Sequence, residues 1–97
     1  MKRRNILKIL AEHRGEIESR FCVASLSIFG SVARNEAAAG SDVDVLVTYE
    51  KTPGLFGFVE LKEYLEDILQ CPVDLVTKNA LKKQFRDQIL QEALHVV

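Results

Sequence analysis

Two aspartates separated by one valine, Asp42 and Asp44, open a run of β-branched and apolar residues that continues to Val47. That composition favours a β-strand, and residues two apart on a strand project from the same face. Both carboxylates are therefore expected to point the same way. Two neighbouring carboxylates without a counter-charge repel each other, and one is driven toward protonation. A divalent cation between them removes that cost, so the pair predicts a metal site.

The rest of the chain divides into helical and strand patterns. Apolar spacing predicts a helix over about residues 3–18, a second helix that starts at Thr52-Pro53, and a last helix capped by Asn79. Strand composition predicts three strands: Val23–Phe29, Val43–Tyr49 and Val73–Thr77. This order predicts an α+β fold with helices packed on a small sheet of about three strands. The 97 residues suit a single domain over residues 1–97.

Charge and cysteine usage exclude several classes of protein. The 13 Lys and Arg residues balance 14 Asp and Glu residues, so no positive field predicts direct binding of nucleic acid. Cys22 and Cys71 form no pattern typical of a zinc site or a disulfide framework. No apolar run approaches the roughly 20 residues that cross a bilayer, and the basic N-terminus leads into no signal-peptide core. We therefore expect a cytoplasmic protein with no membrane contact.

Four further residues fit the chemistry of nucleotide transfer. Gly30-Ser31 ends the first predicted strand, where backbone N–H groups and a hydroxyl can hold a triphosphate. Arg34, one turn later, can pair with a phosphate. Asp74, on the third predicted strand, would orient or deprotonate an attacking hydroxyl, while two metal ions hold the charge of an in-line displacement. Each also has a structural interpretation: an ordinary turn at Gly30-Ser31, a surface role for Arg34, and a solvent-facing edge position for Asp74.

At these positions the chain resembles the DNA polymerase β nucleotidyltransferase superfamily. The resemblance is greatest to its minimal nucleotidyltransferase (MNT) branch, the antitoxins paired with HEPN-domain toxins. Three blocks carry it: Gly30–Arg34, Ser41–Val47 and Pro72–Thr77. It implies a mixed sheet of the polymerase β palm type. One departure is Asn35, where relatives often have glycine; asparagine tolerates left-handed backbone angles, so we expect the turn to survive.

Members of that branch use magnesium as cofactor and add AMP from ATP to a tyrosine of the partner toxin, a HEPN ribonuclease. This modification silences the toxin. The resemblance thus implies ATP as substrate, two Mg²⁺ ions, and a hetero-oligomer with a HEPN toxin that supplies part of the acceptor site. It implies Asp42, Asp44 and Asp74 as catalytic metal ligands, and Gly30, Ser31 and Arg34 as nucleotide-binding residues.

Two other functions stay open from the sequence. The chain is a binding module if it neutralises its toxin by occlusion and keeps the nucleotide site only as structure. Alternatively, the acceptor is a small molecule or an RNA end. No dedicated acceptor pocket is recognisable in 97 residues, and the balanced charge argues against RNA.

Overall fold

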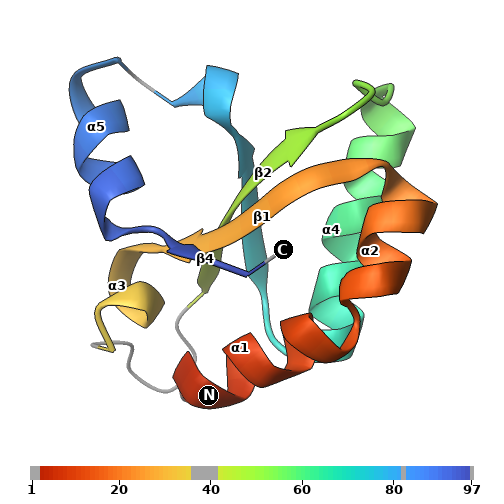
Figure 1. Ribbon diagram of the computed structural model, residues 1–97, viewed down its shortest axis with the longest axis horizontal. Helices are drawn as coiled ribbons and strands as arrows, with labels where there is room; N and C mark the ends of the chain where they lie inside the picture. The colour runs from red at the N-terminus through yellow and green to blue at the C-terminus, as the bar shows by residue number, and fades with distance from the viewer. Residues whose placement is uncertain (1–2, 36–41, 82, 97) are drawn as a thin grey trace.

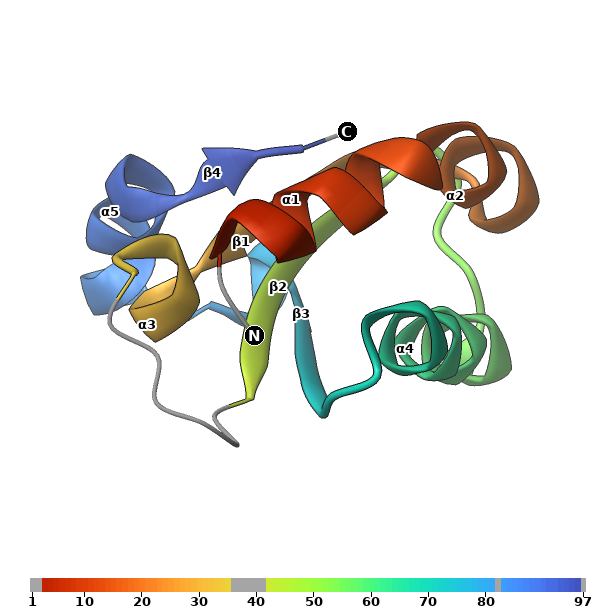
Figure 2. The same ribbon diagram turned by 90° about the horizontal axis from the view of Figure 1, so that it is seen from below.

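The computed structural model describes residues 3–35, 42–81 and 83–96 of the chain (Figure 1). Ser41, which belongs to the second sequence block, lies outside the described residues. Helices α1, α2 and α4 lie on one side of a central sheet, and α5 lies on the other (Figure 2). The short helix α3 follows the end of β1, and its buried residues Val32 and Ala33 join the core shared with α1, α2 and α4. None of the helices in these three ranges is long and apolar enough to cross a membrane.

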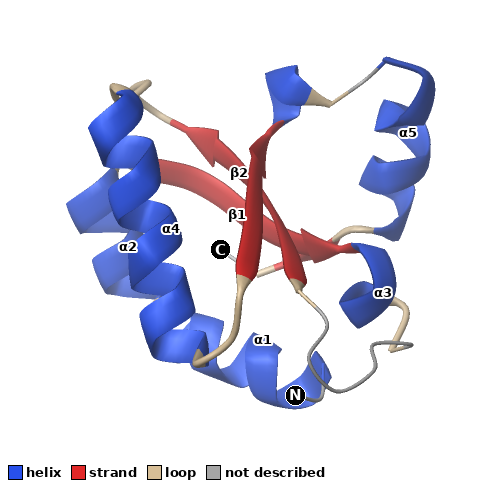
Figure 3. Ribbon diagram, turned by 180° about the vertical axis from the view of Figure 1, so that it is seen from behind, coloured by secondary structure: helices blue, strands red, loops and turns tan. Residues whose placement is uncertain are grey.

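Within the described residues the sheet has four strands, in the order β3-β2-β1-β4. Figure 3 draws these strands in red between the helices. β1 pairs antiparallel with β2 and β4, whereas β2 pairs parallel with β3. The strands are β1 (Val23–Phe29), β2 (Val43–Tyr49), β3 (Val73–Thr77) and β4 (Leu94–His95). The expected mixed sheet and α+β fold are confirmed. The expectation of about three strands missed β4, because two residues are too few to form a strand pattern.

The helices depart from the sequence expectation mainly at their ends. They are α1 (Arg3–Glu12), α2 (Arg14–Phe21), α3 (Gly30–Ala33), α4 (Leu55–Leu69) and α5 (Lys83–Glu92), with a 3₁₀ turn η1 (Lys78–Ala80). The helix expected over residues 3–18 is broken at His13, whose Nδ1 lies 2.8 Å from the Ile9 carbonyl oxygen. The apolar spacing continues through this break and does not reveal it. The second helix begins later than Thr52-Pro53, and Asn79 lies in η1.

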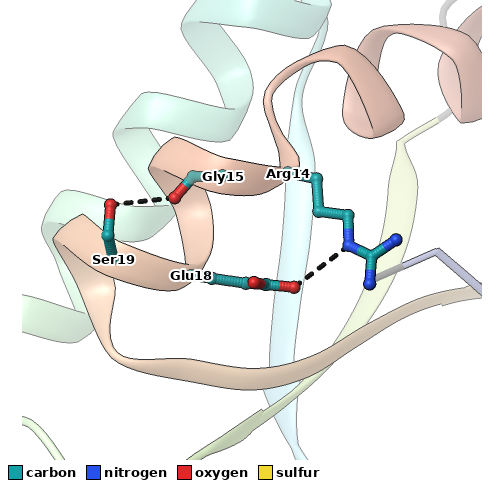
Figure 4. Close-up of polar contacts among 4 residues, drawn as sticks. All are labelled: Arg14, Gly15, Glu18 and Ser19. Atoms are coloured by element: carbon teal, nitrogen blue, oxygen red, sulfur yellow. Dashed lines mark hydrogen bonds and ion pairs between the residues drawn. The ribbon is translucent and has the colours of Figure 1, made fainter.

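On the outer face of α2, the polar contacts of Arg14 and Ser19 stay within the helix (Figure 4). Arg14 Nε donates to Glu18 at 3.1 Å, and the Ser19 hydroxyl donates to the Gly15 carbonyl at 2.8 Å. An exposed ion pair of this spacing contributes only about 0.3–0.5 kcal/mol. The helix is held to the protein instead by its buried side, which carries Ile17 and Phe21.

Among the described residues, a hydrophobic core lies between the sheet and helices α1, α2 and α4, with Val32 and Ala33 of α3 at its edge. Eleven of its side chains are almost completely buried: Ile6, Leu10, Ile17, Leu26, Ile28, Val43, Val45, Val47, Leu61, Leu65 and Leu69. At the start of β2 and of β3, an aspartate lies between two buried residues: Asp44 between Val43 and Val45, and Asp74 between Val73 and Leu75. Both aspartates therefore lie on the sheet face away from the core.

Two leucines of α4 provide a test of this packing. Leu65→Ala should lower the free energy of unfolding by about 2–5 kcal/mol, because it leaves a cavity at a fully buried position. Leu55→Ala in the same helix removes a side chain that is 75% exposed, and should change it by less than about 0.5 kcal/mol. Urea unfolding measures both values. Equal losses would contradict the packing described for α4.

Candidate active site

The pairing of three strands brings together residues that are far apart in the sequence. Phe29, at the end of β1, lies opposite Asp44 in the antiparallel register. Asp44 in turn lies opposite Asp74 in the parallel register of β2 and β3. Because Gly30 directly follows Phe29, the glycine and the two carboxylates meet at one end of the sheet.

Gly30 occupies a position that only glycine fits. Its φ is +71°, in the left-handed region that side chains disfavour. A Cβ atom built at this residue would also collide with the carboxylate of Asp44. The structure therefore explains the glycine as a close approach between the main chain after β1 and the Asp44 side chain, rather than as an ordinary turn.

The electrostatic surroundings of Asp44 are dominated by negative charge. Partial burial raises the pKa of Asp44, and the nearby charges of Asp74 and Asp42 raise it further. The positive charge of Arg34 lowers this pKa, whereas a hydrogen bond with Asp74 raises it. The net pKa shift of Asp44 is upward, so its ionised form is disfavoured in the protein alone. A bound cation would reverse that balance.

The two other predicted carboxylates are both exposed. Asp42 immediately precedes β2, and Asp74 lies between buried neighbours on β3. Carboxylate oxygens are the ligands that Mg²⁺ prefers, so the chemistry of these side chains fits that ion. Among the described residues, however, no three His, Cys, Asp or Glu side chains are grouped so that they could hold a metal ion. The three-aspartate ligand set therefore stays a prediction.

The turn that carries Gly30 and Ser31 is held from within and from outside. The Arg34 N–H donates to the Gly30 carbonyl at 3.1 Å, which closes the four-residue helix α3. From α1, the Arg3 guanidinium donates to the Ala33 carbonyl at 2.9 Å. Ser31 itself is half-buried in α3. These contacts fix the backbone next to the carboxylates.

The side chain of Arg34 pairs with a residue that the sequence did not point to. Its Nη1 lies 3.0 Å from Glu92 Oε2, at the end of α5. The two side chains are 43% and 29% exposed. No local motif indicates Glu92 as a partner of Arg34. Glu92 comes 58 residues after Arg34 in the chain and reaches it only through the fold.

Asn35, the departure noted in the sequence, has a φ of +59°. The expected left-handed turn is thus confirmed. Asn35→Gly should keep the turn, whereas Asn35→Val should lower the free energy of unfolding by about 1–2 kcal/mol, because a β-branched residue is strained at this φ. Thermal unfolding of both variants checks this. A valine variant as stable as the glycine variant would contradict it.

Comparison with known proteins identifies the family. The sequence profile of the nucleotidyltransferase domain matches residues 5–96. The chain belongs to the nucleotidyltransferase domain family. It is 45% identical over 91 residues to a protein named protein adenylyltransferase MntA from Thermococcus cleftensis, a match that covers 94% of this chain and 92% of the relative.

Solved structures agree with this assignment. A structure described as a minimal nucleotidyltransferase superposes with a TM-score of 0.82 at 35% identity, over 97% of this chain and 95% of the other. A chain from a toxin–antitoxin complex with AMP-PNP shares the fold, with a TM-score of 0.71 at 23% identity. That match covers all of this nucleotidyltransferase and 73% of the other chain.

Proposed function

We propose that this nucleotidyltransferase is a protein adenylyltransferase, which moves AMP from ATP to a tyrosine hydroxyl of a HEPN ribonuclease toxin and so neutralises the toxin. The observation that carries the proposal is the 45% identity, over nearly the whole chain, to the adenylyltransferase MntA. A chain in a complex of tri-AMPylated HEPN toxin with MNT antitoxin, from Shewanella oneidensis, also has this fold, with a TM-score of 0.66. The toxin would be the partner in a hetero-oligomer.

The proposed reaction is a displacement at the α-phosphorus of ATP. The tyrosine oxygen forms a bond to that phosphorus, the bond to the oxygen bridging the α- and β-phosphates breaks, and pyrophosphate leaves. Asp74 orients the attacking hydroxyl and takes its proton. The Gly30-Ser31 turn binds the triphosphate through backbone N–H groups and the serine hydroxyl, and the Arg34 guanidinium adds a positive charge beside it.

In this scheme Asp42, Asp44 and Asp74 would together hold two magnesium ions. When bound, magnesium neutralises charge on the phosphate oxygens of such a displacement. The upward shift of the Asp44 pKa supports this role, because the clustered carboxylates lack sufficient positive charge of their own.

A transfer assay with labelled ATP tests the proposal. The chain is incubated with magnesium, ATP labelled in the α-phosphate, and the product of the adjacent gene. We expect label on that partner, and a loss of about 100-fold or more in the variant Asp42→Asn, Asp44→Asn, because several kcal/mol of charge stabilisation are removed. The matched control is Asp67→Asn, Asp87→Asn, which neutralises two exposed carboxylates on α4 and α5.

The same variants separate the proposed enzyme from a binding module. Equal labelling by the wild type and the Asp42→Asn, Asp44→Asn variant would overturn the mechanism. If the wild type transfers no label and this variant still neutralises the toxin in cells, the chain acts by occlusion. Label on RNA or on a small molecule instead of the partner protein would assign a different acceptor.

A further inference from the structure

The C-terminal part of the chain is fixed beside the Gly30 turn. After Glu92, the last residue of α5, the chain returns to the sheet as β4 and pairs with β1 at Ser27 and Ile28. The Val96 N–H donates to the Leu26 carbonyl at 2.8 Å. Figures 1 and 2 both place the end of α5 next to α3. The backbone of Glu92 is thus anchored to the strand that leads into Gly30.

Arg34 is anchored to the same strand from the other direction. Its backbone closes α3 through the bond to the Gly30 carbonyl, and Arg3 holds Ala33 next to it. The ion pair between Arg34 and Glu92, with its 3.0 Å separation, therefore joins two fixed backbones. It differs in this from the pairs within α2, which link residues four apart on one helix.

The Arg34 guanidinium also lies within the electrostatic reach of the candidate site. Its charge acts on Asp44, in the direction opposite to the charges of Asp74 and Asp42. Arg34 is therefore attracted both to Glu92, with which it pairs, and to the carboxylate of Asp44. A guanidinium that paired closely with Asp44 would occupy the carboxylate oxygens that a cation needs.

We propose that Glu92 is a positioning residue, which holds the Arg34 guanidinium away from Asp44 and so keeps that carboxylate available to a divalent cation. Glu92 touches neither the cation nor the substrate in this role. The inference rests on the proposed function in one respect, because it assigns the cation to Asp44. It predicts that the effect of Glu92 on cation binding depends on Arg34.

Calorimetric titration with Mn²⁺ alone, in the absence of nucleotide, tests the positioning role. In Glu92→Gln the affinity for Mn²⁺ should fall about fivefold, which corresponds to a partly exposed ion pair worth about 1 kcal/mol. In an Arg34→Gln background the same substitution should change the affinity by less than about twofold, because no guanidinium is left to move. Glu18→Gln is the matched control, since it removes one carboxylate from the exposed Arg14–Glu18 pair of α2.

Three results would overturn the proposal. One is an unchanged Mn²⁺ affinity in Glu92→Gln, and another is the absence of Mn²⁺ binding by the wild type. The third is an equal loss with and without Arg34, which would reduce Glu92 to a general negative charge near the site. The labelled-ATP assay tests the proposed function independently of this inference. If the chain binds Mn²⁺ with this dependence on Arg34 but transfers no AMP, the proposed function is refuted and the positioning role of Glu92 is not.

Discussion

Asp44→Asn is expected to lower AMP transfer by about 100-fold or more while leaving the protein folded and at least as stable as the wild type. Burial and the charges of Asp74 and Asp42 raise the pKa of Asp44, so its ionised carboxylate is unfavourable in the metal-free protein at neutral pH. The neutral amide removes that repulsion. Transfer of labelled ATP and urea unfolding without metal, both at neutral pH, measure the two effects.

The combination of lost activity and retained stability separates a functional carboxylate from a structural one. Asp67→Asn changes an exposed carboxylate on α4 and should leave transfer unchanged, with a change in unfolding free energy of less than about 0.5 kcal/mol. An Asp44→Asn protein that unfolds more easily than the wild type would contradict the electrostatic account. One that keeps full transfer would remove Asp44 from the proposed metal site.

Gly30→Ala is expected to lower the free energy of unfolding by about 1–3 kcal/mol and to impair AMP transfer as well. The turn holds residue 30 at a φ of +71°, which is unfavourable for alanine. The added methyl group also meets the Asp44 carboxylate, so either the turn or the carboxylate must move. Urea unfolding measures the stability of the variant, and the labelled-ATP assay measures its transfer.

Gly15→Ala makes the same chemical change where the structure has space. Gly15 lies in α2, and a Cβ atom there would meet nothing within 4 Å. This variant should gain about 0.5–1 kcal/mol, because alanine loses less conformational entropy than glycine in a helix, and it should transfer AMP normally. The two alanine variants are thus expected to shift stability in opposite directions. A similar shift in both would contradict the close approach described at Gly30.

The strands that carry the site were predictable because their composition is unambiguous. β1, β2 and β3 begin and end at the residues expected from their apolar and β-branched runs. Strand order was not accessible, since the pairing of Asp44 with Asp74 depends on which strands become neighbours in the folded sheet.

The features that sequence reasoning missed depend on contacts between distant parts of the chain. The break at His13 does not disturb the apolar spacing, and β4 is only two residues long. The pairing of Arg34 with Glu92 is set by the return of the chain along β1, so nothing near Arg34 in the sequence indicates Glu92. Local patterns therefore predicted the candidate site residues, while the fold determined how one of them is held.

Mass spectrometry of the adjacent gene's product, expressed together with this chain, tests the central claim most directly. With the wild-type chain the account predicts that the partner gains the mass of one or more AMP groups, and that fragmentation places them on tyrosine. With the Asp44→Asn chain the partner should stay unmodified. A partner that is neutralised but carries no AMP with either chain, or that is modified equally by both, would contradict the account.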